Sequence, residues 1–465
     1  MAASGELRLI LETGCKTCAA RGVKCPGFEV RLAWPSDMAG SKRKGRHLTA
    51  RSSAAPASVS AITPRQTPEE SMIRDLSPLG LPAEESFLMQ HFLQNVSRIS
   101  LAVDNNENGY RLLLPLALAE PSLLNATLAV AASHHSRWQH TVDLSSRKYL
   151  RASCTSLRDR FADPELIRQP ATLASMLFLA TYEVFLGSVR WRGHYDAIRE
   201  WVRSRGDCSD VDSFLLNWVC LLDTQSAINL GTSSMPELDP WMDSSTQGNT
   251  VDVLFGCSAR LPRLMAEASR LYVSSRDGLM TPDQVSQQAE HLQQQIGALA
   301  IDPESSPSIG LSCTSTSHSF STTVGMDEEE LRKRAVATAE IFRHASHIYV
   351  HRIAHGPGET LPPDMRRSLD TALGLLTMVP DARGPGANLG WCLVVLGAEL
   401  DGADERDYIT ARWENLHLLA LSNNRNGQRT LEEAWRRRDL VASGRAEPER
   451  WQDTMLRIGE SQILV

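Results

Sequence analysis

The sequence contains no hydrophobic run long enough to cross a membrane. Its longest apolar stretch, "ATLASMLFLATYEVFLGS" (residues 171–188), carries Tyr182 and Glu183 near its end and lies among charged residues. A membrane-spanning helix needs about 20 apolar residues, so we expect this stretch to be a buried helix. The N-terminal "MAASGELRLILETG" also lacks the basic region, long apolar segment and cleavage site of a secretory signal, which predicts an intracellular protein.

Catalytic signatures are absent too. The sequence has no GxSxG elbow, no P-loop, no GxGxxG after a strand and no HExxH. Its glycine-containing "ARGPGANLG" (residues 382–390) has neither the spacing nor the flanking strand of a phosphate-binding loop. We therefore expect that the protein is not an enzyme.

The alternation of apolar and polar residues that is typical of β-strands is almost absent as well, and this absence determines the fold class that we expect. From residue 84 onward apolar residues recur at spacings of three and four, which predicts an all-α body of packed helix pairs. No fixed-period repeat is apparent, and no heptad segment follows the first cysteines to support a coiled-coil dimer. Pro121 opens one helix, whose expected core face contains Leu124, Leu128, Ala131, His135 and Trp138. Further helices are expected at about 85–101, 145–161, 169–187, 191–204, 211–229, 257–275, 282–299, 327–355, 363–378, 388–401, 404–421 and 428–442.

Composition divides the chain into three zones. Residues 14–35 form a cysteine-containing segment, and residues 36–83 are rich in Ser, Ala, Pro, Arg and Lys, which predicts a disordered linker. Residues 84–465 are expected to form the helical domain. Mobile loops are expected near 231–250 and at 302–325, because the second of these is a Ser/Thr-rich segment with little to bury.

The net charge of −7 conceals an asymmetry. Residues 1–51 contain ten Lys or Arg and four Asp or Glu, a charge of +6, so the remaining chain carries −13. A basic N-terminal segment is typical of a protein that binds a polyanion such as DNA, although a solvated basic tail has the same composition. In the linker, "SKRKGRH" (residues 41–47) is a candidate nuclear-import or phosphate-binding run. Its cations are Lys42, Arg43, Lys44 and Arg46.

Histidines recur at helical spacing in "FRHASHIYVHRIAH", which contains His344, His347, His351 and His355. Imidazoles four residues apart on a helix can share a metal ion, and a metal-dependent enzyme would then be the consequence. The alternative is an ordinary helix face whose rings are packed or hydrogen-bonded, and the lack of a nearby carboxylate or cysteine favours it. The same alternatives apply more weakly to His134, His135 and His140.

The chain has nine cysteines, and three of them lie in "GCKTCAARGVKCPGF" near the N-terminus. Cys15, Cys18 and Cys25 have the spacing of a zinc site, yet a closed structural zinc site takes four ligands. Arg21 and Lys24 are interleaved with them, where they could meet phosphates or base edges. The other cysteines are expected to be packing residues of a reduced protein: Cys154, Cys208, Cys220, Cys257, Cys313 and Cys392.

This stretch resembles the fungal zinc binuclear cluster (Zn2Cys6) family, in which two halves of C-x2-C-x6-C type hold two zinc ions. "TGCKTC", with the basic residues before the third cysteine, is similar to the first half, and "AARGVKCPGFEVRLAWP" is similar to the tail of the second. The resemblance implies that Cys15, Cys18 and Cys25 are zinc ligands. It also implies that Arg21 and Lys24 enter the major groove of DNA at CGG-type triplets.

Later phrases resemble the fungal-specific transcription factor domain of the subgroup related to the acriflavine-sensitivity control protein. They are "NNENGYRLLLPLALAEPSLLNATLAVAASH", "MLFLATYEVFLGSVRWRGHYDAIREWVRSRG", "LGWCLVVLGAELDGADERDYITARW" and "LEEAWRRRD". The residues that carry the resemblance are Tyr182, Glu183, Trp191, His194, Trp391, Gly397, Glu399, Glu405, Arg406, Trp413, Trp435 and Asp439. The resemblance spans about residues 84–442 and implies the all-α regulatory domain that the periodicity also predicts.

Taken together, the resemblance implies a nuclear transcriptional regulator with zinc as its cofactor and with DNA and the transcription machinery as partners; a homodimer is left open. Structural zinc contributes on the order of 10 kcal/mol or more to folding such a module. With three thiolates, the half cluster is expected to be weakly ordered and completed by water, by His47 or by a second chain. The alternative, from another class, is a helical interaction protein that has lost direct DNA binding.

Overall fold

The computed structural model describes residues 80–104, 108–244, 250–301, 328–380, 384–460 and 463–464. The backbone divides into Met1–Asp75 and Leu76–Val465, and only the second part contains described residues. Within them no strand forms, and the β-type pairing found is an isolated antiparallel bridge between Val251 and Ser258. The expected all-α fold class is therefore confirmed for this part of the chain.

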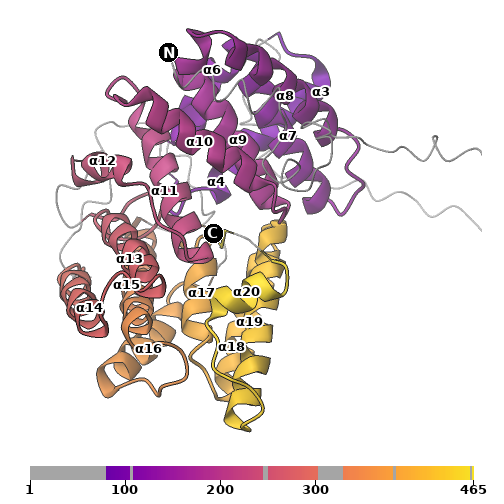
Figure 1. Cartoon of the computed structure of the whole chain (residues 1–465). Helices are drawn as coiled ribbons and strands as arrows, with labels where there is room; N and C mark the ends of the chain where they lie inside the picture. The colour runs from indigo at the N-terminus through magenta and orange to yellow at the C-terminus, as the bar shows by residue number, and fades with distance from the viewer. Residues whose placement is uncertain are drawn as a thin grey trace, which may run out of the picture. The chain divides into compact units, whose positions relative to one another are not determined.

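Helices α3 to α11 form the first group, drawn in indigo to magenta in Figure 1. Their bounds are α3 Ala83–His91, α4 Ser97–Ile99, α5 Gly109–Leu112, α6 Leu114–Ala119, α7 Pro121–Trp138, α8 Ser146–Ala162, α9 Pro170–Phe185, α10 Trp191–Arg205 and α11 Ser213–Leu230. A π-helical turn, Phe92–Val96, joins α3 to α4. Helix α7 packs on α3, α6, α8 and α9, and α10 packs on α9, so α7 and α9 form the centre of this group.

Helices α12 to α20 form the second group. Their bounds are α12 Asp239–Ser244, α13 Leu261–Arg276, α14 Pro282–Gly297, α15 Glu328–His355, α16 Pro363–Leu376, α17 Gly390–Gly397, α18 Ala403–His417, α19 Ser422–Ala442 and α20 Trp451–Arg457. The long helix α15 contacts α13, α14, α16 and α17, while α19 contacts α17, α18 and α20 (Figure 1). The two groups meet where α11 packs on α13 and α20, and where α9 packs on α19.

Local sequence signals explain where many of these helices begin and end. Proline occupies the first turn of α7, α9, α13, α14 and α16, where its missing N–H has no intrahelical partner to lose. Thr281 and Gln284 form a reciprocal capping box at the start of α14. Asp212 caps α11, and Gly231 ends it with a φ of 61°, a left-handed conformation that favours glycine.

The hydrophobic core is continuous across both groups of helices. Helix α9 is buried along almost its whole length, with Glu183 only 5% exposed, so the prediction of a buried helix is confirmed. The predicted core face of α7 is partly wrong: Trp138 is 39% exposed and Leu124 and His135 are only half-buried. Because α7 is surrounded by four other helices, its burial is not confined to one stripe.

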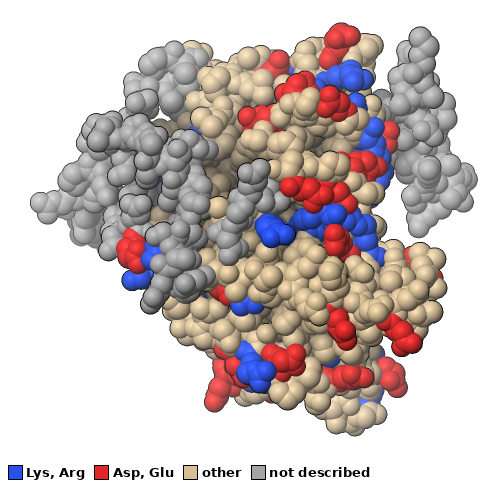
Figure 2. Space-filling view, turned by 90° about the vertical axis from the view of Figure 1, so that its left-hand side faces the viewer, with Lys and Arg blue, Asp and Glu red and all other residues tan. Residues whose placement is uncertain are grey.

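Other differences from the sequence predictions involve short elements. Helices α5, α6, α12 and α20 were not expected, and α12 lies inside the segment near 231–250 that was expected to be a loop. Asp239, at the start of α12, accepts hydrogen bonds from the Arg270 guanidinium at 3.0 and 3.2 Å, which anchors this helix to α13. On the face that Figure 2 shows, Lys and Arg side chains lie beside Asp and Glu side chains. The expected mobile loop at 302–325 and residues 245–249 lie outside the described residues.

The crossing of α18 and α19 depends on Gly427. A Cβ atom at this position would lie 2.5 Å from Cη2 of Trp413, which is 1% exposed, and 3.0 Å from Cδ2 of Leu464. We expect Gly427→Ala to lower the free energy of unfolding by about 1–3 kcal/mol through overpacking, despite the better helix propensity of alanine. Urea unfolding followed by circular dichroism measures the change.

Gly374 provides the matched control for this prediction. It lies in α16 and is exposed, and a Cβ atom added to it would meet no other atom within 4 Å. Gly374→Ala should therefore stabilise the protein by about 0.5–1 kcal/mol, as expected for an exposed helical glycine. Equal stabilisation by both substitutions would contradict the close packing of α18 and α19.

Candidate functional site

The residues predicted to bind zinc and DNA lie outside the described part of the chain. They are Cys15, Cys18, Cys25, Arg21 and Lys24, together with the candidate import residues Lys42, Arg43, Lys44 and Arg46. Their roles stay predictions. Within the described residues, no group of three His, Cys, Asp or Glu side chains is placed to hold a metal ion. Among the described helices, none combines the length and hydrophobicity that a membrane crossing requires.

The four histidines of α15 have separate partners. His344 lies 3.0 Å from the Arg343 guanidinium, and the Nδ1 atom of His347 lies 3.3 Å from the Ser368 hydroxyl on α16. The rings of His351 and His355 adjoin, with centroids 4.3 Å apart. Burial lowers the pKa of His344 and of His351 to about 4, so both are neutral at physiological pH. This arrangement resembles a packed helix face more than a shared metal site.

A second histidine cluster links α3 and α7 to the turn before α19. The Nε2 atom of His91 lies 2.8 Å from Nδ1 of His134, and Nε2 of His134 lies 3.1 Å from the Leu419 carbonyl. The Asn95 side-chain amide lies 3.2 Å from Nδ1 of His91. One tautomer assignment satisfies the whole chain: Asn95 donates to His91, His91 donates to His134, and His134 donates to Leu419. Both imidazoles are neutral in this arrangement.

The cysteines of the helical domain behave as the sequence predicts where they are buried. Cys220, Cys257 and Cys392 are free thiols in the core, and burial raises the pKa of each. Cys154 and Cys208 are only half-buried, and Cys313 lies outside the described residues. The buried thiols are packing residues without the electropositive surroundings of a reactive cysteine.

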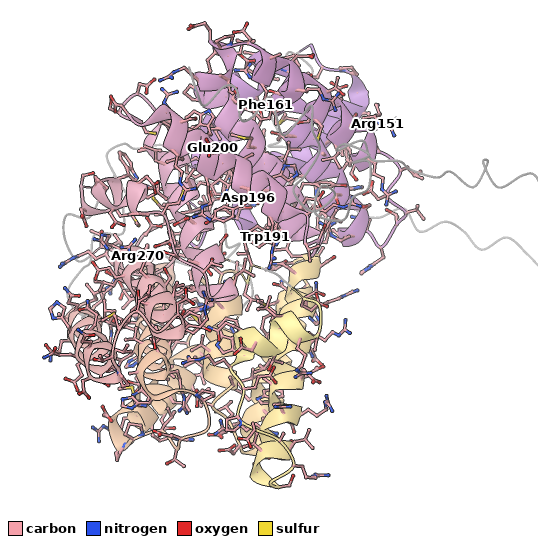
Figure 3. All side chains as sticks on the ribbon, in the orientation of Figure 1. Arg151, Phe161, Trp191, Asp196, Glu200 and Arg270 are labelled. Atoms are coloured by element: carbon pink, nitrogen blue, oxygen red, sulfur yellow. The ribbon has the colours of Figure 1, made fainter. Side chains whose placement is uncertain are left out.

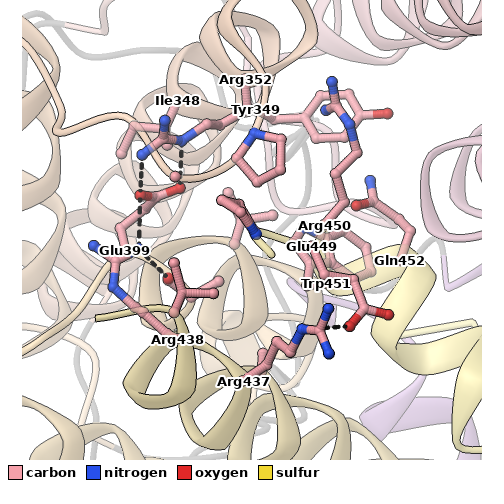
Figure 4. A pocket seen from close by; sticks show the side chains of 17 residues that line it. Ile348, Tyr349, Arg352, Glu399, Arg437, Arg438, Glu449, Arg450, Trp451 and Gln452 are labelled. Atoms are coloured by element: carbon pink, nitrogen blue, oxygen red, sulfur yellow. Dashed lines mark hydrogen bonds and ion pairs between the residues drawn. The ribbon is translucent and has the colours of Figure 1, made fainter. Parts of the chain in front are cut away.

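The main candidate site is a pocket of about 740 Å³, measured with its open mouth, between α15, α17, α19 and the segment that leads into α20. We call it the arginine pocket. Figure 4 shows its lining, which combines charged side chains with apolar ones. The charged lining residues are Arg352, Arg437, Arg438, Arg450, Glu399 and Glu449.

Two of these arginines are neutralised by close ion pairs. Arg352 binds Glu399 in a bidentate manner, with N–O distances of 2.8 and 2.6 Å, and both side chains are almost fully buried. It also donates to the carbonyls of Gly356 and Glu359. Arg438 binds both carboxylate oxygens of Asp401 and lies 3.9 Å from Glu399 (Figure 4). These pairs fix α15 and α19 to the end of α17.

The other two arginines keep part of their binding capacity. The Nε atom of Arg437 lies 3.3 Å from Glu449 and donates to the Glu447 carbonyl at 3.0 Å. Glu449 also binds Arg457, which has a second partner in Glu433. Arg450 donates to the Ile353 carbonyl at 3.5 Å and lies over the Tyr272 ring, and no carboxylate among the described residues lies within ion-pairing distance of it. The pocket therefore has an excess of positive charge.

Tyr349 lines the same pocket, is 3% exposed, and its hydroxyl has no hydrogen-bond partner among the described residues. Burial raises the pKa of this hydroxyl, so it remains a neutral donor. Sequence reasoning identified neither Tyr349 nor Arg450 as a site residue. The only local signal was the run of three arginines at 436–438 inside "LEEAWRRRD".

A second pocket of about 800 Å³, again including its open part, lies between the two groups of helices. Its lining is mainly apolar and aromatic, with Tyr110, Phe185, Trp218 and Phe342 among its residues. Its described lining residues include no Lys, Arg, Asp or Glu. The two pockets thus differ in charge, and only the arginine pocket offers cations to a ligand.

The residues that carry the sequence resemblance make contacts between helices. Glu399 holds Arg352, and the Trp435 indole donates to the Gly397 carbonyl at 2.7 Å. Arg406 of α18 binds both carboxylate oxygens of Asp439 on α19 and lies over the Trp435 ring. In the first group, Trp191 is 1% exposed at the start of α10 (Figure 3), and burial lowers the pKa of His194 to about 4. The residues that carry the sequence resemblance therefore stabilise the packing of helices in this fold.

Comparison with known proteins agrees with this conclusion. A family model described as the fungal-specific transcription factor domain matches residues 87–464, which is most of the chain and contains α4 to α20. No curated protein matches the chain, and no solved structure does. The matching family is one of transcription factors and not a class of enzymes. The chain therefore belongs to the family of the fungal-specific transcription factor domain and is a transcription regulator.

Proposed function

We propose that the chain is a nuclear, DNA-binding transcription factor of the fungal zinc-cluster class, in the subgroup related to the acriflavine-sensitivity control protein. One observation carries the proposal: the family's helical domain follows a segment in which Cys15, Cys18 and Cys25 are interleaved with Arg21 and Lys24. In this proposal the N-terminal segment contacts CGG-type triplets, the basic run of the linker directs nuclear import, and the helical domain regulates transcription by RNA polymerase II.

Zinc suits the type of donor in this segment but not the number of donors. Cysteine thiolates are preferred zinc ligands, yet a closed structural site takes four ligands and a binuclear cluster has six cysteines. With three cysteines we expect at most one zinc ion per chain. Water, His47 or a second chain would complete its coordination, and the last of these would make the homodimer the DNA-binding form.

The proposal predicts that zinc and DNA binding depend on the same residues. The full chain should retain zinc after dialysis and shift a CGG-containing duplex at lower concentration than a scrambled one. Replacing Cys15, Cys18 and Cys25 by Ser should remove both properties. Replacing Arg21 and Lys24 by Gln should keep the zinc and weaken DNA binding about tenfold or more, because a good base contact discriminates by about 1–3 kcal/mol. Metal analysis and gel-shift titration at fixed salt measure these effects.

Cys208→Ser is the matched control, because Cys208 is a half-buried thiol of the helical domain and should not affect zinc content. A folded full chain that retains no zinc and binds both duplexes equally would overturn the proposal and favour the alternative of a helical interaction protein without direct DNA binding. Sequencing the transcript across the codons for residues 10–30 would show whether further cysteine codons belong to this segment.

A further inference from the structure

We propose that the arginine pocket binds a small amphipathic organic anion, with its acidic group at Arg450 and Tyr349 and its apolar part against the walls of α17 and α19. The site goes beyond the proposed function, because it lies in the helical domain and would exist whether or not the N-terminal segment binds DNA. Three properties of the pocket support this ligand class: its charge, its unpartnered polar groups and its apolar walls.

Charge comes first. The lining contains four arginines and two glutamates. Arg352 is neutralised by Glu399, and Arg438 by Asp401, which lies outside the lining. Arg437 shares Glu449 with Arg457, which also binds Glu433, so Arg450 is the lining arginine without a close ion pair among the described residues. A carboxylate, sulfonate or phosphate in the pocket would thus supply the missing negative charge.

The unpartnered polar groups point to the place of the acidic group. Arg450 donates to the Ile353 carbonyl at 3.5 Å, lies over the Tyr272 ring and interacts electrostatically with Asp453 without a close ion pair. Its planar guanidinium offers five donors, so most of them lack a partner among the described residues. Tyr349 is buried with no partner for its hydroxyl among the described residues. Buried polar groups are almost always hydrogen-bonded in native proteins, and a bound anion would satisfy both side chains.

The walls account for the apolar part of the ligand. The pocket is also lined by apolar and aromatic side chains: Ile348, Val395, Ala434, Val441 and Trp451. An inorganic ion would leave these side chains in contact with water, so an organic anion fits the pocket better.

The test uses the full chain and two fluorescent probes of similar shape. One is 8-anilinonaphthalene-1-sulfonate, an aromatic anion; the other is N-phenyl-1-naphthylamine, which lacks the sulfonate. We expect saturable binding of the anion, and a loss of affinity of about tenfold or more in Arg450→Gln, because hydrogen bonds to charged groups are among the stronger ones. The neutral probe should bind more weakly and should not respond to this substitution.

Two further variants distinguish binding in the pocket from binding elsewhere on the protein. Ala434→Leu, which fills the pocket without changing its charge, should also abolish binding of the anion. Arg151→Gln, at an exposed position on α8 (Figure 3), is the matched control and should bind as the parent does. Far-UV circular dichroism and the melting temperature of each variant show that the fold is retained.

The proposal would be overturned by either of two results. One is unchanged affinity for the anion in both Arg450→Gln and Ala434→Leu. The other is loss of binding on Thr181→Phe, which fills the apolar pocket between the helix groups, with Arg450→Gln unaffected. Failure of DNA binding by the N-terminal segment would change neither result, so this proposal and the proposed function are tested separately.

Discussion

Replacing Arg352 by Met should lower the free energy of unfolding by about 3–5 kcal/mol, because it leaves Glu399 as a buried carboxylate without its main partner. The remaining cation near Glu399 is Arg438, at 3.9 Å, and Asp401 already binds it. The carbonyls of Gly356 and Glu359 also lose their donor. Urea unfolding of the full chain at neutral pH, followed by circular dichroism, measures the loss.

A double-mutant cycle distinguishes a lost ion pair from a general packing defect. Arg352→Met/Glu399→Leu replaces both charges by apolar groups, and we expect it to be more stable than Arg352→Met alone. The control is Arg366 and Glu405, a partly exposed pair at 2.9 Å, where the corresponding change should cost less than about 1 kcal/mol. If the double variant is as unstable as the single one, the uncompensated carboxylate is not the cause.

Acidification should destabilise the helical domain well before its carboxylates titrate. Burial, and secondarily the charge of neighbouring groups, lowers the pKa of His91 to about 3 and of His134 to about 4, from an unfolded value near 6.5. Below pH 6.5 the unfolded chain therefore binds protons that the folded chain does not, and stability falls as the pH drops toward 4. At pH 5 this amounts to about 2 kcal/mol for each of the two histidines.

The variant that tests this prediction is His91→Phe/His134→Leu, which removes both titrating groups from the cluster. Its loss of stability between pH 7.5 and pH 5 should be about 4 kcal/mol smaller than that of the parent. His291→Gln, at an exposed position on α14, should show the pH dependence of the parent. An equal loss in the double variant and the parent would mean that other groups cause the acid sensitivity.

The fold could largely be predicted, because each long helix has a hydrophobic periodicity that can be recognised within its own segment of the sequence. Helix α9 was expected at 169–187 and lies at Pro170–Phe185, and α15 was expected at 327–355 and lies at Glu328–His355. Helix α12 has six residues and α20 has seven, so neither shows two full periods, and both were missed. Contacts made by other parts of the chain hold these short helices in place.

The site was less predictable than the fold, and two examples show why. The α15 histidines do share a helix, but Ser368 on α16 and the burial of each ring decide their role, and neither can be inferred from spacing. In the arginine pocket, Tyr349 and Arg450 are about a hundred residues apart in the sequence. No local pattern relates them, because tertiary packing places the residue before α20 against α15, where Arg450 donates to the Ile353 carbonyl.

The contacts at the end of α7 have a consequence for biosynthesis. His134 and Arg137 reach the carbonyls of Leu419 and Ala420, across sequence separations of 285 and 283 residues. Ribosomes add about 5–20 residues per second, so these acceptors emerge roughly 15–60 seconds after the helix that binds them. During that interval the first group of helices has been synthesised but lacks its packing contacts with the later residues. Its exposed apolar surface can then bind chaperones or aggregate. Truncation before residue 420 should therefore impair the folding of the first helix group as well as the second.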